Sequence, residues 1–95
     1  MNSSKVASYL GFAIKSGNII FGYDNLRKYR GRSNPLVLYD NTFAPKATQK
    51  LIELCRKNSW QIYLVDVSIE QLIHRNCKVV AITDENMARA IIQNI

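Results

Sequence analysis

The sequence predicts an α/β protein, a three-layer α/β/α sandwich in which a small four-stranded mixed sheet lies between two layers of helices. Three observations predict this fold. Helical and strand-type apolar patterns alternate along the whole chain. Each apolar run is short, and 95 residues are enough for one domain with its own core but not for two. Such alternation is typical of folds whose helices cover both faces of a sheet.

Apolar periodicity and turn residues locate the individual elements. Helices are expected at about 5–16, 23–30, 45–58, 69–75 and from 85 onward. Strands are expected at about 18–21, 36–39, 61–65 and 78–83. The run at 36–39, with sequence LVLY, is nearly continuously apolar, which is typical of a strand covered on both faces.

The helix boundaries carry residues suited to capping. Side chains that accept hydrogen bonds stand at the expected N-caps, which are Ser3 or Ser4, Ser68 and Asp84. Gly17 fits the left-handed residue that ends a helix, and Pro45 fits the first helical position. Helical spacing places four apolar residues on the buried side of the helix at 45–58: Leu51, Ile52, Leu54 and Cys55.

The charge balance favours a polyanionic partner. The chain has 13 Lys and Arg against 7 Asp and Glu, a formal net charge of +6, and its pI is about 9.6. A small basic domain of this kind usually binds nucleic acid. The apolar runs are too short to cross a bilayer and no secretory leader is recognised, so a cytoplasmic protein with no membrane partner is expected.

The two cysteines, Cys55 and Cys77, do not predict a metal site. They form no CxxC pair and have no histidine at ligand spacing. Two reduced thiols in or near the core are the favoured interpretation, and a disulfide between them is the alternative.

No catalytic constellation is recognised. The single histidine, His74, stands beside Arg75, and the chain has no nucleophile elbow, Walker loop or dinucleotide fingerprint. Asp40 follows an apolar strand, as the phosphorylated aspartate of a response-regulator receiver does, but Asp24 has no acidic neighbour to complete a metal site after the first strand. We therefore expect no enzyme, no metal and no cofactor.

The stretch NIIFGYDNLRKYRGR, residues 18–32, is the most informative. Four cations follow Asp24 with no acid before Asp40, namely Arg27, Lys28, Arg30 and Arg32. Gly22 permits a positive φ or a close approach, and the helix start beyond it offers free N–H groups to phosphate. Asp24 and Asn25 suit base edges. A solvated amphipathic helix capped by Asp24 is the alternative.

Three segments together resemble a known superfamily. They are LGFAIKSGNIIFGYDNLRK, LVLYDNTFAPKATQKLIELC and VVAITDENMARAI. Their order is similar to that of the ribosomal proteins L-seven-Ae and L-thirty-e, most closely the small bacterial YlxQ-like members. The resemblance covers nearly the whole chain. It implies a three-layer α/β/α sandwich that binds RNA, often kink-turns, with ribosomal RNA and ribosome-associated proteins among the implied partners in translation.

The motif that carries RNA binding in this superfamily is a glycine, a variable residue, often Asn-Glu, two more residues and a lysine. Here it reads GYDNLRK, in which the glycine and the lysine match and the acid and amide are exchanged. The resemblance implies that the RNA-binding residues include Gly22, Tyr23, Asp24, Asn25, Arg27 and Lys28.

A second surface of the superfamily flanks this motif. It comprises the loop from Asp40 to Pro45 and the segment QLIHRNCKVV before the last strand, which is shorter than usual and has Ile73 at the expected glycine. Lys15 and Arg75 are further candidates for contact with phosphates. Tyr23 or Phe43 is a candidate to stack on an unpaired base.

The sequence thus predicts a non-enzymatic RNA-binding protein that recognises kinked or structured RNA. The alternative is a protein-interaction adaptor that keeps the fold without kink-turn specificity. The exchanged Asp24–Asn25 pair and the short late loop favour the adaptor, and the basic stretch at 27–32 favours RNA binding.

Overall fold

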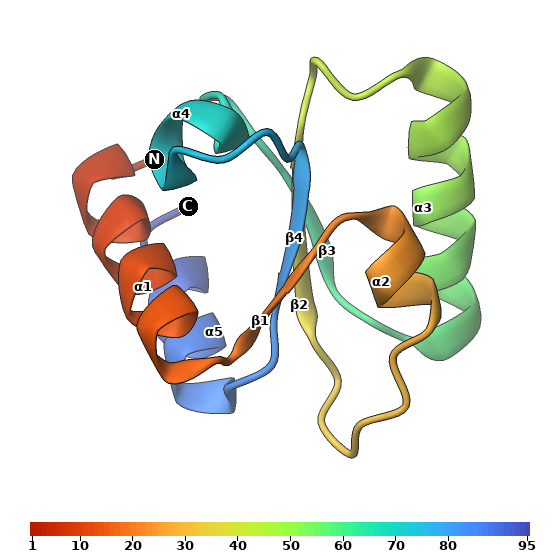
Figure 1. The fold of residues 1–95 in the computed structure, drawn as a ribbon, viewed down its shortest axis with the longest axis horizontal. Helices are drawn as coiled ribbons and strands as arrows, with labels where there is room; N and C mark the ends of the chain where they lie inside the picture. The colour runs from red at the N-terminus through yellow and green to blue at the C-terminus, as the bar shows by residue number, and fades with distance from the viewer.

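Five helices and four strands alternate along the chain in the computed structural model, which describes residues 1–95 (Figure 1). The helices are α1 (Ser3–Ser16), α2 (Tyr23–Arg27), α3 (Pro45–Asn58), α4 (Ile69–Ile73) and α5 (Glu85–Ile92). The strands are β1 (Ile19–Phe21), β2 (Leu36–Asp40), β3 (Ile62–Val65) and β4 (Val79–Ile82).

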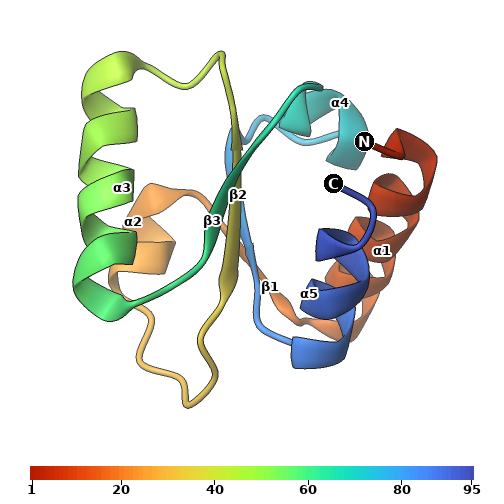
Figure 2. The same cartoon turned by 180° about the vertical axis from the view of Figure 1, so that it is seen from behind.

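The strands form one mixed sheet in the order β1-β4-β2-β3. β4 runs antiparallel to both of its neighbours, β1 and β2, whereas β2 and β3 are parallel and joined through α3. Helices α1, α4 and α5 cover one face of the sheet, and α2 and α3 cover the other (Figures 1 and 2). The predicted three-layer sandwich with a small mixed sheet is confirmed.

Alternate residues of the two central strands build two cores. All four residues of β4 are buried. Val80 and Ile82 belong to the larger core, under α1, α4 and α5, whereas Val79 and Ala81 belong to the smaller core, under α2 and α3. Because successive side chains of a strand point to opposite faces, an apolar run such as 79–82 is stable only with both faces covered.

Most of the expected caps are confirmed. Ser68 Oγ accepts a hydrogen bond from Gln71 N, and Asp84 Oδ1 accepts one from Met87 N. Gly17 ends α1 with a φ of 73°, and Pro45 begins α3. The N-cap of α1 was expected at Ser3 or Ser4 but is Asn2, whose Oδ1 accepts from Lys5 N. The cap lies one or two residues earlier than expected, and Asn2 can serve because an amide oxygen caps as well as a hydroxyl.

Two helices are shorter than the patterns predict, and one buried residue was misplaced. α2 ends at Arg27, and α4 ends at Ile73 because His74 takes the left-handed conformation with a φ of 56°. Ile52 was expected on the buried side of α3, but it is 43% exposed. No helix of the structure is long and apolar enough to span a membrane.

The two cysteines are free and belong to different faces of the sheet. Cys55 is buried in the core under α3, and burial raises the pKa of its thiol to about 11. Cys77 packs against the core on the opposite face and donates a hydrogen bond to Val79 O. A disulfide between them is therefore incompatible with this fold, because the sheet separates the two sulfur atoms.

Asp40 is the only buried charged residue, with 2% of its surface exposed. Its Oδ2 accepts a hydrogen bond from Ile69 N at 2.7 Å, which ties the end of β2 to the start of α4. Its Oδ1 accepts from both the main-chain N–H and the hydroxyl of Thr42. Asp40 was predicted as an RNA contact, but both of its oxygens are engaged inside the fold, so its role is structural.

These hydrogen bonds determine the ionisation of Asp40. Burial acts to raise the pKa of its carboxyl, but the donors from Thr42 and Ile69, together with the positive charge of Lys78, outweigh it and lower the pKa below the usual 3.8. Hydrogen bonds to the charged form stabilise it more than the neutral form.

Replacing Asp40 by asparagine is expected to destabilise the protein by about 1–3 kcal/mol at about pH 7, because an amide N–H would then face a backbone donor. Since the folded-state pKa is lowered, the carboxylate contributes its full stabilisation above pH 3.8, and this is lost as the pH falls below that value. Urea unfolding of both proteins measures this. If the wild-type and Asp40→Asn proteins are equally stable at neutral pH, the hydrogen bonds that Asp40 accepts from Thr42 and Ile69 do not stabilise the fold.

Candidate nucleic-acid interface

The turn between β1 and α2 is held by hydrogen bonds on both sides of Gly22. Gly22 N donates to Val79 O of β4 at 2.9 Å, and Leu26 N donates to Gly22 O at 3.1 Å. Asn25 Nδ2 donates to Phe21 O at 2.8 Å. Gly22 has φ 83° and ψ 160°, a conformation that is essentially restricted to glycine. The sequence therefore requires a glycine here for its backbone geometry.

This turn presents charged side chains to solvent. Asp24, Arg27 and Lys28 are all exposed, and none of them has an ion-pair partner. They lie within one turn of helix, since Arg27 is the last residue of α2 and Lys28 its C-cap. Asn25 differs from the expectation, because its amide N–H is used to fix the turn and its side-chain oxygen alone is free for a ligand.

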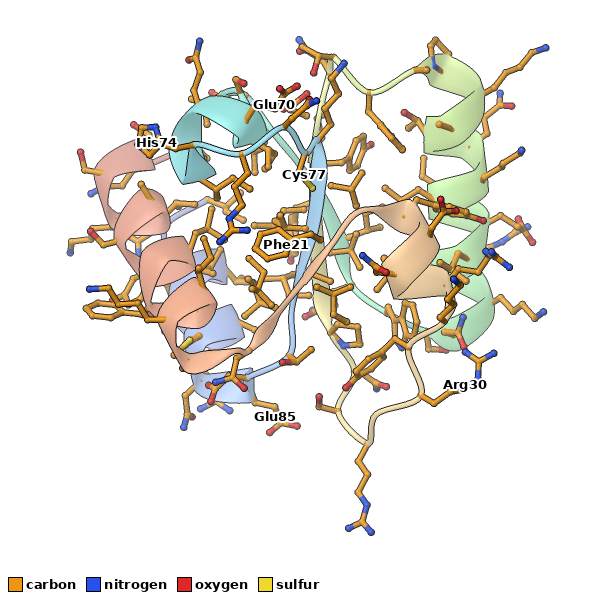
Figure 3. The ribbon with its side chains drawn as sticks, in the orientation of Figure 1. Phe21, Arg30, Glu70, His74, Cys77 and Glu85 are labelled. Atoms are coloured by element: carbon orange, nitrogen blue, oxygen red, sulfur yellow. The ribbon has the colours of Figure 1, made fainter.

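Arg75 lies against the strand that leads into this turn. Its guanidinium carbon is 4.6 Å from the centroid of the Phe21 ring, a cation–π contact with the last residue of β1. Phe21 lies on the face of the sheet toward α1 (Figure 3). In the same loop, Lys78 Nζ donates to Thr42 O at 3.4 Å. The loops 40–44 and 74–78 are therefore in contact, and the second loop reaches β1.

The structure brings most of the predicted site residues together but leaves two apart. Lys15 precedes β1 in the last turn of α1, whereas Gly22 follows it, so they lie at opposite ends of that strand. Asp40 is buried, as described above. The two candidates for base stacking, Tyr23 and Phe43, are half-buried and pack against the core under α2 and α3.

The positive charge of the protein is concentrated on one side of the sheet. Segments 22–34 and 45–58, which form the α2–α3 layer and the loop after α2, contain eight Lys and Arg and two Asp and Glu, a net charge of +6. The remaining residues contain five of each and are neutral. The α2–α3 layer therefore accounts for the whole net charge of the protein.

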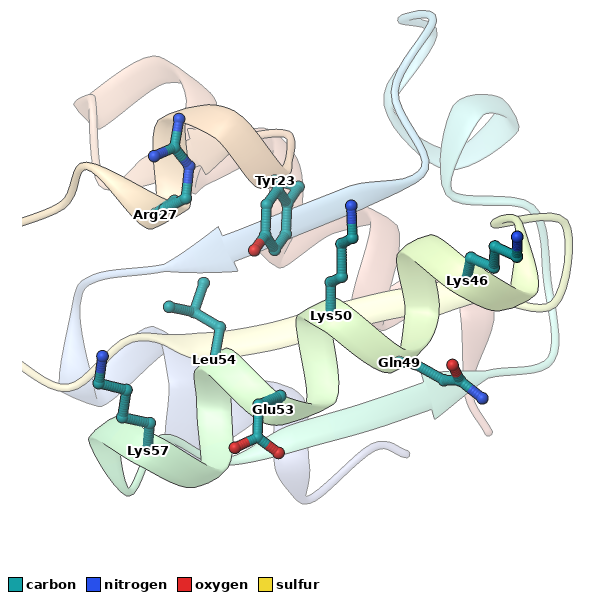
Figure 4. Close-up of a pocket in the computed structure, with 8 residues that line it drawn as sticks. All are labelled: Tyr23, Arg27, Lys46, Gln49, Lys50, Glu53, Leu54 and Lys57. Carbon is teal, nitrogen blue, oxygen red and sulfur yellow. The ribbon is translucent and has the colours of Figure 1, made fainter.

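A groove of about 610 Å³ separates α2 from α3 (Figure 4). Its lining residues are Tyr23, Arg27, Lys46, Gln49, Lys50, Glu53, Leu54 and Lys57. Lys46, Lys50 and Lys57 point toward the α2 side of α3, whereas Glu53 points away from it. Glu53 is ion-paired with Arg56, the only ion pair in the structure, so the groove is strongly positive.

The cations of α3 were missed by the sequence analysis. Their spacing was the available signal, since Lys46, Lys50 and Lys57 are four and seven residues apart and such residues share one face of a helix. The basic run at 27–32 is the more conspicuous signal, because its charges are close together in sequence. Only the packing of α3 beside α2 unites the two groups.

The arrangement is an exposed, positively charged surface. No cluster of three or more His, Cys, Asp or Glu side chains is close enough to hold a metal ion. His74 is exposed at the end of α4 and has no hydrogen-bonded acid beside it. What the surface can do is neutralise a polyanion and accept hydrogen bonds at Asp24.

Comparisons with known proteins support the fold but give no information on function. No family model matches the chain, and no curated protein matches it. Among solved structures, it is similar to a protein with unknown function from Bacillus halodurans C, with a TM-score of 0.80 and 19% identity over 94% of each chain. A likeness at this identity shows a shared fold alone.

Replacing Gly22 by alanine is expected to destabilise the protein by about 1–3 kcal/mol, because alanine does not adopt the Gly22 backbone conformation without strain. Space is not the reason, since an added Cβ would meet no atom within 4 Å. Denaturant unfolding provides the measurement. Gly11→Ala, also in open space but inside α1, is the matched control and should be neutral or stabilising. Equal stability of Gly22→Ala and wild type would disprove the claim that the backbone conformation at this position requires glycine.

Proposed function

We propose that this chain is a non-enzymatic RNA-binding protein of the cytoplasm that recognises kinked or structured RNA in translation. The observation that supports the proposal most is the distribution of charge. A net charge of +6 is confined to the α2–α3 layer and its loop, and no carboxylate lies within 4.0 Å of any cation there except Arg56. Surfaces of this kind bind polyanions by releasing condensed counterions.

The turn at Gly22 supplies the selective part of the proposed site. Its hydrogen bonds hold Asp24 at a fixed position on an exposed edge, where a carboxylate can accept hydrogen bonds from base amino or imino groups. Arg27 and Lys28 stand beside it to neutralise phosphates. Phosphate contacts provide affinity and position, whereas base contacts provide specificity.

RNA is favoured over DNA by the form of the surface. The Gly22 turn follows β1, an edge strand of the sheet, and α2 has five residues, too few for a long recognition helix in the major groove of DNA. RNA recognition uses bulges, loops and bends in which bases are accessible. The resemblance of GYDNLRK to the superfamily motif supports the same assignment.

The test is a titration of the protein with a labelled kink-turn RNA and with a perfect duplex of the same length. We expect preference for the kinked RNA and a steep salt dependence. Four phosphate contacts would weaken binding roughly a hundredfold between about 50 and about 200 mM salt. Lys28→Ala should weaken binding to both RNAs about fivefold, because a phosphate contact carries no sequence information.

The matched control is Lys5→Ala, which removes the same charge from α1 on the other side of the sheet and should leave binding unchanged. Lys28 is an exposed C-cap whose side chain makes no hydrogen bond within the protein, so its replacement should not affect folding. Absence of binding to both RNAs would reject the proposal and favour the adaptor.

A further inference from the structure

We propose that the groove between α2 and α3 binds a single-stranded RNA segment that flanks the structured RNA at the Gly22 turn. This inference rests on the proposed function, and it assigns a separate surface to an unpaired strand. The groove of 610 Å³ adjoins a second hollow of about 560 Å³ beside the loop after α2. Arg27, Leu54 and Lys57 line both hollows, and we refer to the two together as the channel.

The walls of this channel have the charge that a phosphate backbone requires. Five cations line it: Arg27, Arg30, Lys46, Lys50 and Lys57. The single acid, Glu53, points away from α2 and is paired with Arg56 (Figure 4). The Arg30 guanidinium also donates to the carbonyls of Arg27 and Tyr29, which fixes it at the end of α2.

Aromatic rings line the channel together with these cations. Tyr23 lines the first hollow, and Tyr29 and Trp60 line the second. Tyr29 and Trp60 form an edge-to-face pair, with centroids 6.1 Å apart and planes at 66°, and the Tyr29 hydroxyl is hydrogen-bonded to Ser33. All three rings are partly exposed. Basic grooves lined with aromatic rings are typical of single-strand binding, because any unpaired base can stack on them.

The length of the charged row suits a short strand. From Lys46 to Lys57, α3 rises about 16 Å at about 1.5 Å per residue. This equals about five stacked nucleotides at about 3.4 Å each along one strand. A duplex would place its bases out of reach of the rings, since paired bases are stacked inside the helix. An unpaired strand is therefore the occupant that uses both the cations and the aromatic side chains.

Trp60 makes the inference directly testable, because it is the only tryptophan of the chain and lies in the channel. The full-length protein is titrated with an oligouridylate of about ten nucleotides, while tryptophan emission is followed. Binding in the channel should change the emission of Trp60. Lys50→Ala combined with Lys57→Ala should weaken this binding about tenfold, because two phosphate contacts are lost.

The matched control is Lys5→Ala combined with Arg89→Ala, which removes two exposed cations from α1 and α5 on the opposite face of the sheet. This variant should bind like wild type. The side chains of Lys50 and Lys57 are exposed and make no hydrogen bond within the protein, so the channel variant should keep its fold, which circular dichroism would verify.

The outcomes separate this inference from the proposed function. If the protein binds kink-turn RNA but Trp60 emission does not respond to oligouridylate, the channel is overturned and the proposed function stands. The same holds if the channel variant and the control variant lose oligouridylate binding equally. Equal binding of polyglutamate of similar length would also overturn it, because the channel would then accept any polyanion. If Trp60 emission responds to oligouridylate but the protein binds kink-turn RNA and a perfect duplex equally, the channel is supported and the proposed preference for structured RNA is rejected.

Discussion

Burial of both faces of β4 is the constraint on which the rest of the structure depends. The strand lies inside the sheet, paired with β1 and β2, and all four of its residues are buried. Its odd-numbered and even-numbered residues point to opposite faces of the sheet, so each face must pack against its own layer of apolar side chains. The larger core under α1, α4 and α5 covers one face, and the smaller core of Leu26, Leu51 and Cys55 covers the other. Without α2 and α3, the smaller face would be exposed.

This requirement also creates the candidate interface. Helix α2 contributes Leu26 as its only buried residue, so its other positions remain available for charged groups at the surface. In α3, Leu51 and Cys55 face the sheet and the lysines lie on the outer faces. The two helices that cover the smaller core thus bring the basic residues of 27–32 beside those of 46–57. The charged surface follows from the way the second core is covered.

Much of the fold was predictable from local patterns. The order of elements, the cap residues Ser68 and Asp84, and the bounds of α3 depend on side chains close in sequence. The role of Asp40 was not predictable, since its decisive partner, the backbone N–H of Ile69, is 29 residues away. The spacing of the α3 lysines shows that they share one helix face, but their position beside α2 depends on tertiary packing that no local pattern specifies.

The most direct test of the central claim, that the α2–α3 layer and the adjoining loops bind RNA, is a map of backbone amide chemical shifts during titration with kink-turn RNA. The account predicts the largest changes in segments 22–34, 45–58 and 74–78, with little change in α1 and α5. Changes concentrated on α1 and α5 would contradict it, because the excess of positive charge lies in segments 22–34 and 45–58 and the rest of the chain is neutral overall.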